Sequence, residues 1–422
     1  MQETELNQQS QRLVSLDAMR GLIMCLLACN GLALAKTARK LGYGPNVEVD
    51  SFVGQVWQFL SFHNSHPIWT SQFYYVGCSM WDLIQPAFMF MVGVAMPYSY
   101  AKRRQRGDSE LNLTLHAAIR AFVLVAIGVY LQTRNSGLAS NRLFTNVLSQ
   151  IGLGYFFVFL LLGRSFKFQL AAGISVLLAY WYWLFQYPVL ELTQAAVDSI
   201  ASLHVNETVG QHFALTGNGA AGVDVKLLNW LFETKEPIAA HKAGYTTLNF
   251  IPSAVTILIG VFAGSLLKSD RSATQKVTWL MLGGLIAMVL AVVASVTVCP
   301  VVKKIWTPSW VLFSGAWVLW ILALLYWIVD IRGFKRWTFP LVVVGMNSLA
   351  MYLMGMLFKG TINANLKTYL GKNLGDNKAD HSGFVEAMFL GPYAPTLQSI
   401  GVFIVLWLIC FYLYRNKLFF RV

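Results

Sequence analysis

The chain has 422 residues, of which 56% are hydrophobic and only 12% are charged. About one quarter of the residues of a soluble globular domain are charged, so this composition excludes such a domain and indicates a polytopic membrane protein. The net charge of +13 does not indicate nucleic-acid binding, because the basic residues lie in short loops between apolar runs. We therefore expect contact with membrane lipid and no nucleic-acid partner.

Ten apolar runs approach the length of about 20 residues that a helix needs to cross a bilayer. They cover residues 13–35, 80–101, 116–133, 147–163, 168–185, 248–267, 277–298, 310–329, 339–359 and 394–413. The pattern predicts an all-α polytopic membrane protein with about ten transmembrane helices, in a single domain over residues 1–422. The polar start MQETELNQQSQR has no apolar core followed by a cleavage site, so we expect no removable signal peptide.

Lysine and arginine gather in one set of short loops, for example in KRRQR at 102–106 and in the tail after residue 413. Short basic loops stay in the cytoplasm, so ten crossings place both termini there. Three long segments then face outwards, at 36–79, 186–247 and 360–392, and all three contain aromatic residues. They are either packed functional caps or simple covers for the helix ends.

Polar side chains inside the spans are candidates for function. Asp17 and Arg20 are three residues apart on one helix face, so they can pair. This pair either anchors the first helix or lets Arg20 hold an anionic ligand. Asn30, Gln150 and Asn347 are amides within spans, where they either bond to neighbouring helices or line a path for substrate.

The segment from residue 63 to residue 93 joins a wet, aromatic stretch to the second span. His66 lies shortly before Asp82, and a carboxylate beside a histidine fixes its tautomer for general-base chemistry. His63 and His66 have a spacing that could hold a metal, but no HExxH motif and no third ligand at diagnostic spacing accompany them, so we expect no metal site. Cys78 and Cys299 would both lie at the outer face, as a disulfide or as two free thiols.

A series of motifs follows in order along nearly the whole chain. It begins with RLVSLDAMRG, HPIW, WDLIQPAFMFMVGVAMPYS and KRRQRG, and continues with VLSQIGLGYF, GNGAAGVD, IPSAVTILIGVFAGSLL, PSWVLFSGAW, VVVGMNSLAMYL and LYRNKLFF. This series resembles the transmembrane acyltransferase family of heparan-α-glucosaminide N-acetyltransferase and its bacterial relatives.

The resemblance implies a single transmembrane acyltransferase domain in a bacterial inner membrane. Acetyl-CoA would be used from the cytoplasmic side, and the acetyl group would pass to the amine (or hydroxyl) of a glucosamine-type sugar on the periplasmic side. The family's essential histidine lies in an H-x-x-W element, which matches His66 here, while Asp82 and Asn30 match its other polar positions. The resemblance also implies a homodimer, for which the sequence carries no motif of its own.

A mechanism follows from these positions. We expect His66 to act as general base or as acyl carrier, Asp82 to orient it, and Asn30 to stabilise the thioester oxygen. The charged CoA nucleotide is expected at cytoplasmic arginines, since arginine suits bidentate phosphate contacts. Those arginines are Arg20, Arg103, Arg104 and Arg120, and Gln150 and Asn347 would line the path of the pantetheine arm.

The acceptor sugar stays open, because the chain departs from the animal enzyme mainly in its outer loops and at some span positions. Gln150, for instance, stands where the animal enzyme has arginine. Two other readings compete with the enzyme. A sugar transporter of the inner membrane also needs polar residues at the bilayer midplane, and a scaffold would need no site at all.

Overall fold

The structure is a computed structural model that describes residues 13–44, 47–371 and 388–420. Regular structure in these ranges is helical, apart from an antiparallel hairpin of β1 (Gln72–Phe73) and β2 (Gly77–Cys78). The predicted all-α polytopic fold is confirmed. The chain forms two compact units, which are described one at a time: unit 1 holds residues 1–33, 273–281 and 320–421, and unit 2 holds residues 34–272 and 282–319. The single domain stays a prediction.

Within the described ranges, seven helices are long and apolar enough to cross a membrane, and the count reaches nine if two bent helix pairs are each one span. The predicted count of ten is therefore not reached. Residues 147–163 form the 15-residue α7 (Val147–Leu161), which rises about 22 Å, short of a hydrocarbon core of about 30 Å. The seven are α5 (Met80–Gln105), α6 (Glu110–Thr133), α8 (Phe166–Gln186), α12 (Phe250–Lys268) with its preceding turn, α13 (Ala273–Thr297), α14 (Pro308–Leu325) with its following turn, and α18 (Ala394–Arg415).

The chain is thus a multi-pass membrane protein. An odd number of crossings would put the two termini on opposite sides of the bilayer, so the cytoplasmic placement of both stays a prediction.

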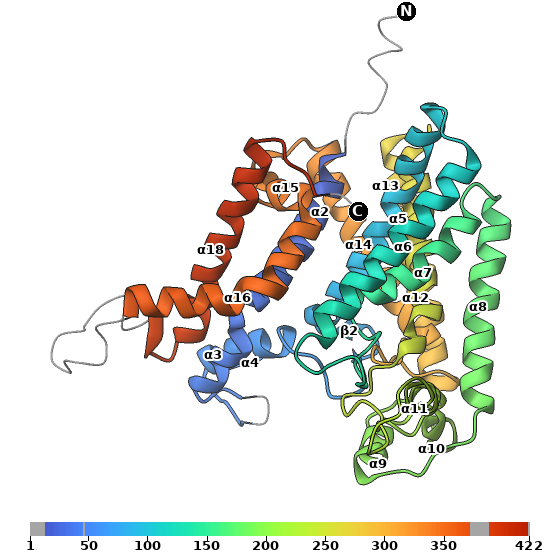
Figure 1. Ribbon diagram of the computed structural model, residues 1–422, viewed down its shortest axis with the longest axis vertical. Helices are drawn as coiled ribbons and strands as arrows, with labels where there is room; N and C mark the ends of the chain where they lie inside the picture. The colour runs from blue at the N-terminus through green and yellow to red at the C-terminus, as the bar shows by residue number, and fades with distance from the viewer. Residues whose placement is uncertain (1–12, 45–46, 372–387, 421–422) are drawn as a thin grey trace, which may run out of the picture. The chain divides into compact units, whose positions relative to one another are not determined.

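Unit 2 is built around α5 and α12, which pack along each other (Figure 1). Glycines let the two backbones approach closely. A Cβ atom added at Gly93 would lie 1.9 Å from the carbonyl oxygen of Ile257, and one at Gly260 would lie 2.0 Å from that of Phe90. The helix starts follow from local sequence, since Ser79 caps α5 and Asn146 caps α7 with side-chain oxygens that accept backbone N–H groups.

The predicted long segments of unit 2 are folded. Residues 36–79 contain most of α3 (Leu34–Lys40), the helix α4 (Phe52–His63) and the hairpin. Residues 186–247 contain α9 (Gln194–Ala201), α10 (Glu207–Gly210), η2 (Gln211–Phe213) and α11 (Gly219–Leu231). These are packed caps in structure, although their predicted position outside the membrane stays a prediction.

Unit 1 contains two broken helices. The first predicted span divides into α2 (Val14–Ala28), a turn η1 (Asn30–Ala33), and α3, with a bend of 43° between the helical parts. The ninth divides into η5 (Arg336–Thr338) with α15 (Phe339–Met346), and α16 (Ser348–Gly371), with a bend of 70°. Since α16 continues to Gly371, the predicted segment 360–392 begins as helix; its residues 372–387 lie outside the described part of the chain.

Within unit 1, α2 packs tightly on α15. A Cβ atom at Gly345 would lie 1.9 Å from the carbonyl oxygen of Asp17, and one at Gly21 would lie 1.8 Å from that of Leu341. The close helix approach expected from the small residues around Asn347 is confirmed. The first turn of α2 is further held by the Asp330 carboxylate, which accepts the N–H groups of Val14 (3.1 Å) and Ser15 (3.2 Å).

Candidate active site

His66 and Asp82 contact each other in unit 2. His66 Nδ1 lies 2.6 Å from Asp82 Oδ1, and the Asp82 side chain is only 3% exposed whereas that of His66 is 38% exposed. An ionised carboxylate only accepts hydrogen bonds, so Nδ1 carries the proton and donates it to Asp82. The predicted contact is present, and this tautomer leaves the Nε2 lone pair of His66 available for another partner.

Lys303 completes this cluster and was missed by the sequence reasoning. Its Nζ lies 3.3 Å from Asp82 Oδ1 and 3.4 Å from His66 Nδ1, and its side chain is 3% exposed. A buried ammonium next to a buried carboxylate forms an ion pair that each partner needs. The available signal was the lysine pair in CPVVKKIWT, a rare place for charge in an apolar segment.

The N-terminus of α5 fixes the position of Asp82 in its first helical turn. The Ser79 hydroxyl accepts the N–H of Trp81 and donates to the carbonyl oxygen of Ser65 at 2.7 Å, which joins the start of α5 to the segment leading to His66. The Met80 N–H donates to His63 Nδ1 at 3.4 Å. His63 therefore helps to cap α5, and the chain's choice between the two histidines has a structural reason.

The segment around Lys303 is hydrogen-bonded to the segment that carries His66. Ser71 N–H donates to the Val301 carbonyl at 3.0 Å, and Lys303 N–H donates to Ser71 Oγ at 3.3 Å. Lys304 Nζ donates to the Ile68 carbonyl. These bonds position Lys303 against His66 across a separation of 237 residues in sequence.

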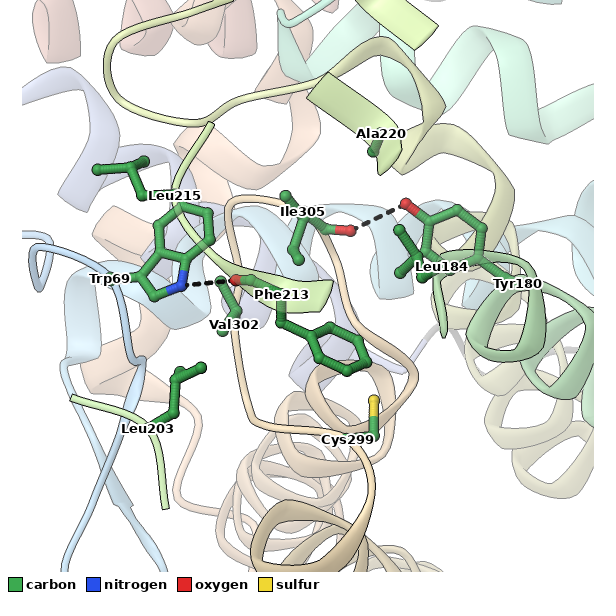
Figure 2. Close-up of a cluster of buried hydrophobic side chains, with 10 residues drawn as sticks. All are labelled: Trp69, Tyr180, Leu184, Leu203, Phe213, Leu215, Ala220, Cys299, Val302 and Ile305. Atoms are coloured by element: carbon green, nitrogen blue, oxygen red, sulfur yellow. Dashed lines mark hydrogen bonds between the residues drawn. The ribbon is translucent and has the colours of Figure 1, made fainter. Parts of the chain in front are cut away.

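A buried aromatic cluster holds both segments from behind, as Figure 2 shows. Trp69 is the tryptophan of the H-x-x-W element, and its indole N–H donates to the Phe213 carbonyl at 3.0 Å. Tyr180 from α8 donates its hydroxyl to the Ile305 carbonyl at 3.1 Å. Burial of these large rings stabilises the loops, so the tryptophan of this element has an anchoring role three residues from His66.

The surroundings of His66 lower its pKa below the ordinary 6.5. Burial of the ring is the main cause, and the positive charge of Lys303 is the next, while Asp82 acts in the opposite direction. A lowered pKa keeps the imidazole neutral near pH 7, which is the form that accepts a proton. The cluster can thus serve as an oriented general base.

The structure places two predicted cofactor residues in surface ion pairs. Arg104 makes two hydrogen bonds to the Glu110 carboxylate, at 2.8 and 3.1 Å, and Arg103 pairs with Asp108 at 3.2 Å. Exposed pairs of this kind contribute about 0–1 kcal/mol, so a phosphate group could replace either carboxylate. Their contact with CoA stays a prediction.

Arg120 differs from these two. Its guanidinium lies 4.9 Å from the centre of the Tyr155 ring, and its Nε is buried with no hydrogen-bond partner among the described residues. Arg120 and Arg103 are both close enough to His116 to act on it electrostatically. This end of unit 2 therefore gathers positive charge around an unused donor, which suits an anion.

Gln150 has a structural role that the sequence left open. Its amide nitrogen donates to the carbonyls of Phe144 (2.7 Å) and Thr247 (3.2 Å), and so ties α7 to the turn before α12. Its Oε1 is buried without a partner in the described structure. Whether this acceptor lines a substrate path stays a prediction.

The remaining predicted residues lie in unit 1. Arg20 pairs with Asp17 at 3.4 Å, as the spacing predicted. Asn347 is fully buried at the break before α16; its Oδ1 accepts the Phe420 N–H at 3.1 Å, and its Nδ2 has no partner in the ranges that the structure describes. Asn30 begins a turn in which four successive residues are left-handed, with φ between 50° and 57°. The ligand-binding roles of all three stay predictions.

Neither a metal group nor a disulfide is present in the described residues. No three of their His, Cys, Asp or Glu side chains come together as metal ligands. Cys78 and Cys299 are both buried free thiols, which answers the alternative that the sequence left open. The chemistry of the cluster accordingly rests on His66, Asp82 and Lys303.

Comparison with known proteins gives two relatives, while no family model matches the chain. Heparan-alpha-glucosaminide N-acetyltransferase of Mus musculus is 26% identical over an alignment that covers 77% of this chain and 53% of the relative. The enzyme of that name from Homo sapiens is 25% identical, with 97% of this chain and 60% of the relative covered. The chain thus spans little more than half the length of these curated relatives. The predicted resemblance is confirmed: the chain is similar over most of its length to heparan-alpha-glucosaminide N-acetyltransferases.

Proposed function

We propose that this protein is a membrane acyltransferase that moves an acetyl group from acetyl-CoA to the amine of a glucosamine-type sugar. The observation that carries the proposal is the hydrogen bond between His66 and the buried Asp82, with Lys303 paired to the same carboxylate oxygen. The names of the two relatives support the reaction and the class of acceptor.

In the proposed reaction, the acceptor nitrogen attacks the thioester carbonyl carbon while His66 Nε2 takes one proton from that nitrogen. The carbonyl forms again as the carbon–sulfur bond breaks. The imidazolium then returns its proton to the departing thiolate, which leaves as CoA thiol. Asp82 stabilises the imidazolium through the Nδ1 hydrogen bond, and general-base catalysis of this kind contributes about 10²–10⁴-fold.

A second route uses the same atom. His66 Nε2 would attack the thioester itself, release CoA, and pass the acetyl group to the acceptor in a second step. The two routes differ in what happens without acceptor, because only the second leaves an acetyl group on His66. Mass spectrometry of protein incubated with acetyl-CoA alone distinguishes them.

The nucleotide of CoA is highly charged, and we propose that Arg103 and Arg120 hold it. The buried unused donor of Arg120 supports this choice. In this account CoA binds on the cytoplasmic side of a bacterial inner membrane and the acceptor binds on the periplasmic side. The homodimer and the cytoplasmic position of both termini belong to the same proposal.

Sidedness has a direct test at Ile68, two residues from His66 and 85% exposed. A cysteine at this position, Ile68→Cys, should react in intact cells with a membrane-impermeant maleimide. Four of the five natural cysteines are buried, so the wild-type chain gives a low background. Labelling that occurs only after the cells are opened would reverse the orientation.

The test of function is CoA release. Purified protein given acetyl-CoA and glucosamine should release CoA thiol, whereas either substrate alone should give at most one equivalent. The broken helices of unit 1 also fit a transporter, since transporters build binding sites from discontinuous helices. Uptake of glucosamine into sealed vesicles without acetyl-CoA, with no CoA release in solution, would favour that alternative.

A further inference from the structure

An open pocket of about 590 Å³ lies in unit 2 beside the segment that carries His66. This volume is within the range of small-molecule sites. One wall comes from the hairpin, another from the end of α4, and a third from the residues after α9. The lining includes Phe62, Gln72, Phe73, Tyr74, Tyr75 and His204. The pocket is therefore mainly aromatic, with a few polar groups.

The two tyrosines occupy an unusual backbone conformation. Tyr74 and Tyr75 form the turn of the hairpin with φ of 43° and 60°, a region that favours glycine or asparagine. Their side chains are 86% and 57% exposed, so burial of these rings does not offset the cost of the turn. Strain that packing does not explain is a sign of function, and here it presents two aromatic rings at the pocket.

Gln72 gives the pocket an unused hydrogen-bond acceptor. The residue is only 4% exposed, and its side-chain nitrogen donates to the Tyr75 carbonyl across the hairpin. Its Oε1 is buried and has no partner in the described part of the chain. A buried polar atom without a partner is costly, and a ligand hydroxyl in the pocket would satisfy it.

The pocket is continuous with the candidate active site. Gln72 follows Ser71, whose side chain hydrogen-bonds to Asp82. Thr70 Oγ1 lies 2.8 Å from Ser202 Oγ, which joins the His66 segment to the wall after α9. A ligand that reaches His66 can therefore extend into the pocket.

We infer that this pocket is a saccharide subsite, which binds the sugar unit next to the one that accepts the acetyl group. The inference rests on the proposed function for the direction in which the acceptor extends. Pyranose rings present C–H groups to the negatively polarised faces of aromatic rings, and their hydroxyls can donate to Gln72 Oε1. The acceptor is then an oligosaccharide of glucosamine type.

Binding of a glucosamine tetrasaccharide to the full chain in detergent, measured by calorimetry without acetyl-CoA, tests the subsite. The double variant Tyr74→Ala/Tyr75→Ala should bind about tenfold more weakly than the wild type, since each ring contributes about 0.5–1.5 kcal/mol. Gln72→Met, which keeps the shape but removes the acceptor, should also weaken binding. Tyr369→Ala removes an equally exposed tyrosine outside the pocket lining and should bind as the wild type does.

Equal binding by the double variant and the wild type, or no binding by either, overturns the subsite. If the wild type binds the tetrasaccharide and the double variant does not, but acetyl-CoA is never consumed, the subsite stands and the acyltransferase proposal fails. Where CoA is released, the double variant should lose more activity with the tetrasaccharide than with free glucosamine. An equal loss with both acceptors would contradict the assignment.

Discussion

Lys303 Nζ and Asp82 Oδ1 lie 3.3 Å apart, and both side chains are 97% shielded from solvent, since each is 3% exposed. The pair joins two loops that are 221 residues apart in sequence. Lys303 thereby offsets the charge of the carboxylate that orients His66. Its own positive charge also acts on the imidazole, and this double role leads to the first two predictions.

Replacement of Lys303 by methionine should move the acidic limb of the rate profile to higher pH. Lys303 lowers the pKa of His66, so its removal raises that pKa and protonates the base at a higher pH. Asp82 and Lys304 also act on the ring and stay in place. We expect a shift of about 0.5–1 pH unit in the midpoint of kcat/KM, with activity relative to wild type increasing as pH rises. Lys304→Met is the matched control, and an equal shift in that variant would contradict the role of Lys303.

Asp82→Asn should reduce turnover about 10²–10⁴-fold, because the amide no longer stabilises the imidazolium. It should also lower the unfolding temperature, since the Lys303 ammonium is left buried without its anion. The double variant Asp82→Asn/Lys303→Met removes both charges. Thermal unfolding of the four proteins in the cycle should show that the double variant loses less stability than the sum of the single variants. Additive losses would mean that the pair is not coupled.

Asp224 predicts a pH-dependent stability. Burial raises the pKa of this carboxyl from 3.8 to about 6, although its Oδ2 accepts the Thr247 N–H at 2.8 Å. The folded protein therefore retains this proton at pH values where the unfolded chain has lost it, so stability falls between about pH 4 and pH 6 and stays lower above. Asp224→Asn should raise the free energy of unfolding above pH 6 by up to about 3 kcal/mol and by little near pH 4. The exposed Asp198→Asn is the control, and a gain of equal size at both pH values would contradict the account.

Gly93→Ala should destabilise the contact between α5 and α12. The added methyl group would lie 1.9 Å from the Ile257 carbonyl oxygen, and overpacking of this kind costs about 1–3 kcal/mol or more. Gly360 in α16 has no atom within 4 Å of its would-be Cβ, so Gly360→Ala should be neutral or slightly stabilising. Unfolding temperatures that fall equally in both variants would show that close approach is not the cause.

The contact between His66 and Asp82 could be predicted because both residues lie at one seam, 16 positions apart. Lys303 could not, because hydropathy and motif spacing report on neighbours in sequence, whereas this lysine reaches the site through a loop 237 positions away. The same limit applies to the pocket at Tyr74, whose third wall comes from the segment after α9.

Apolar runs predicted where the helices lie but not how they are interrupted. Residues 13–35 have the hydropathy of one span, yet the chain turns left-handed at Asn30. Asn347 marks a second break that hydropathy does not register. Both asparagines were singled out as polar residues within spans, and the structure shows that each also marks a change of helix direction, which is decided by backbone conformation.

The central claim is that the wild-type protein transfers acetyl from acetyl-CoA to a glucosamine-type amine with His66 as the base. The most direct measurement is CoA release with glucosamine by the wild type and by His66→Ala at matched unfolding temperature. We predict turnover by the wild type and a loss of about 10²–10⁴-fold in the variant. Full turnover by His66→Ala, or no CoA release by folded wild type with glucosamine or its tetrasaccharide, would contradict the account.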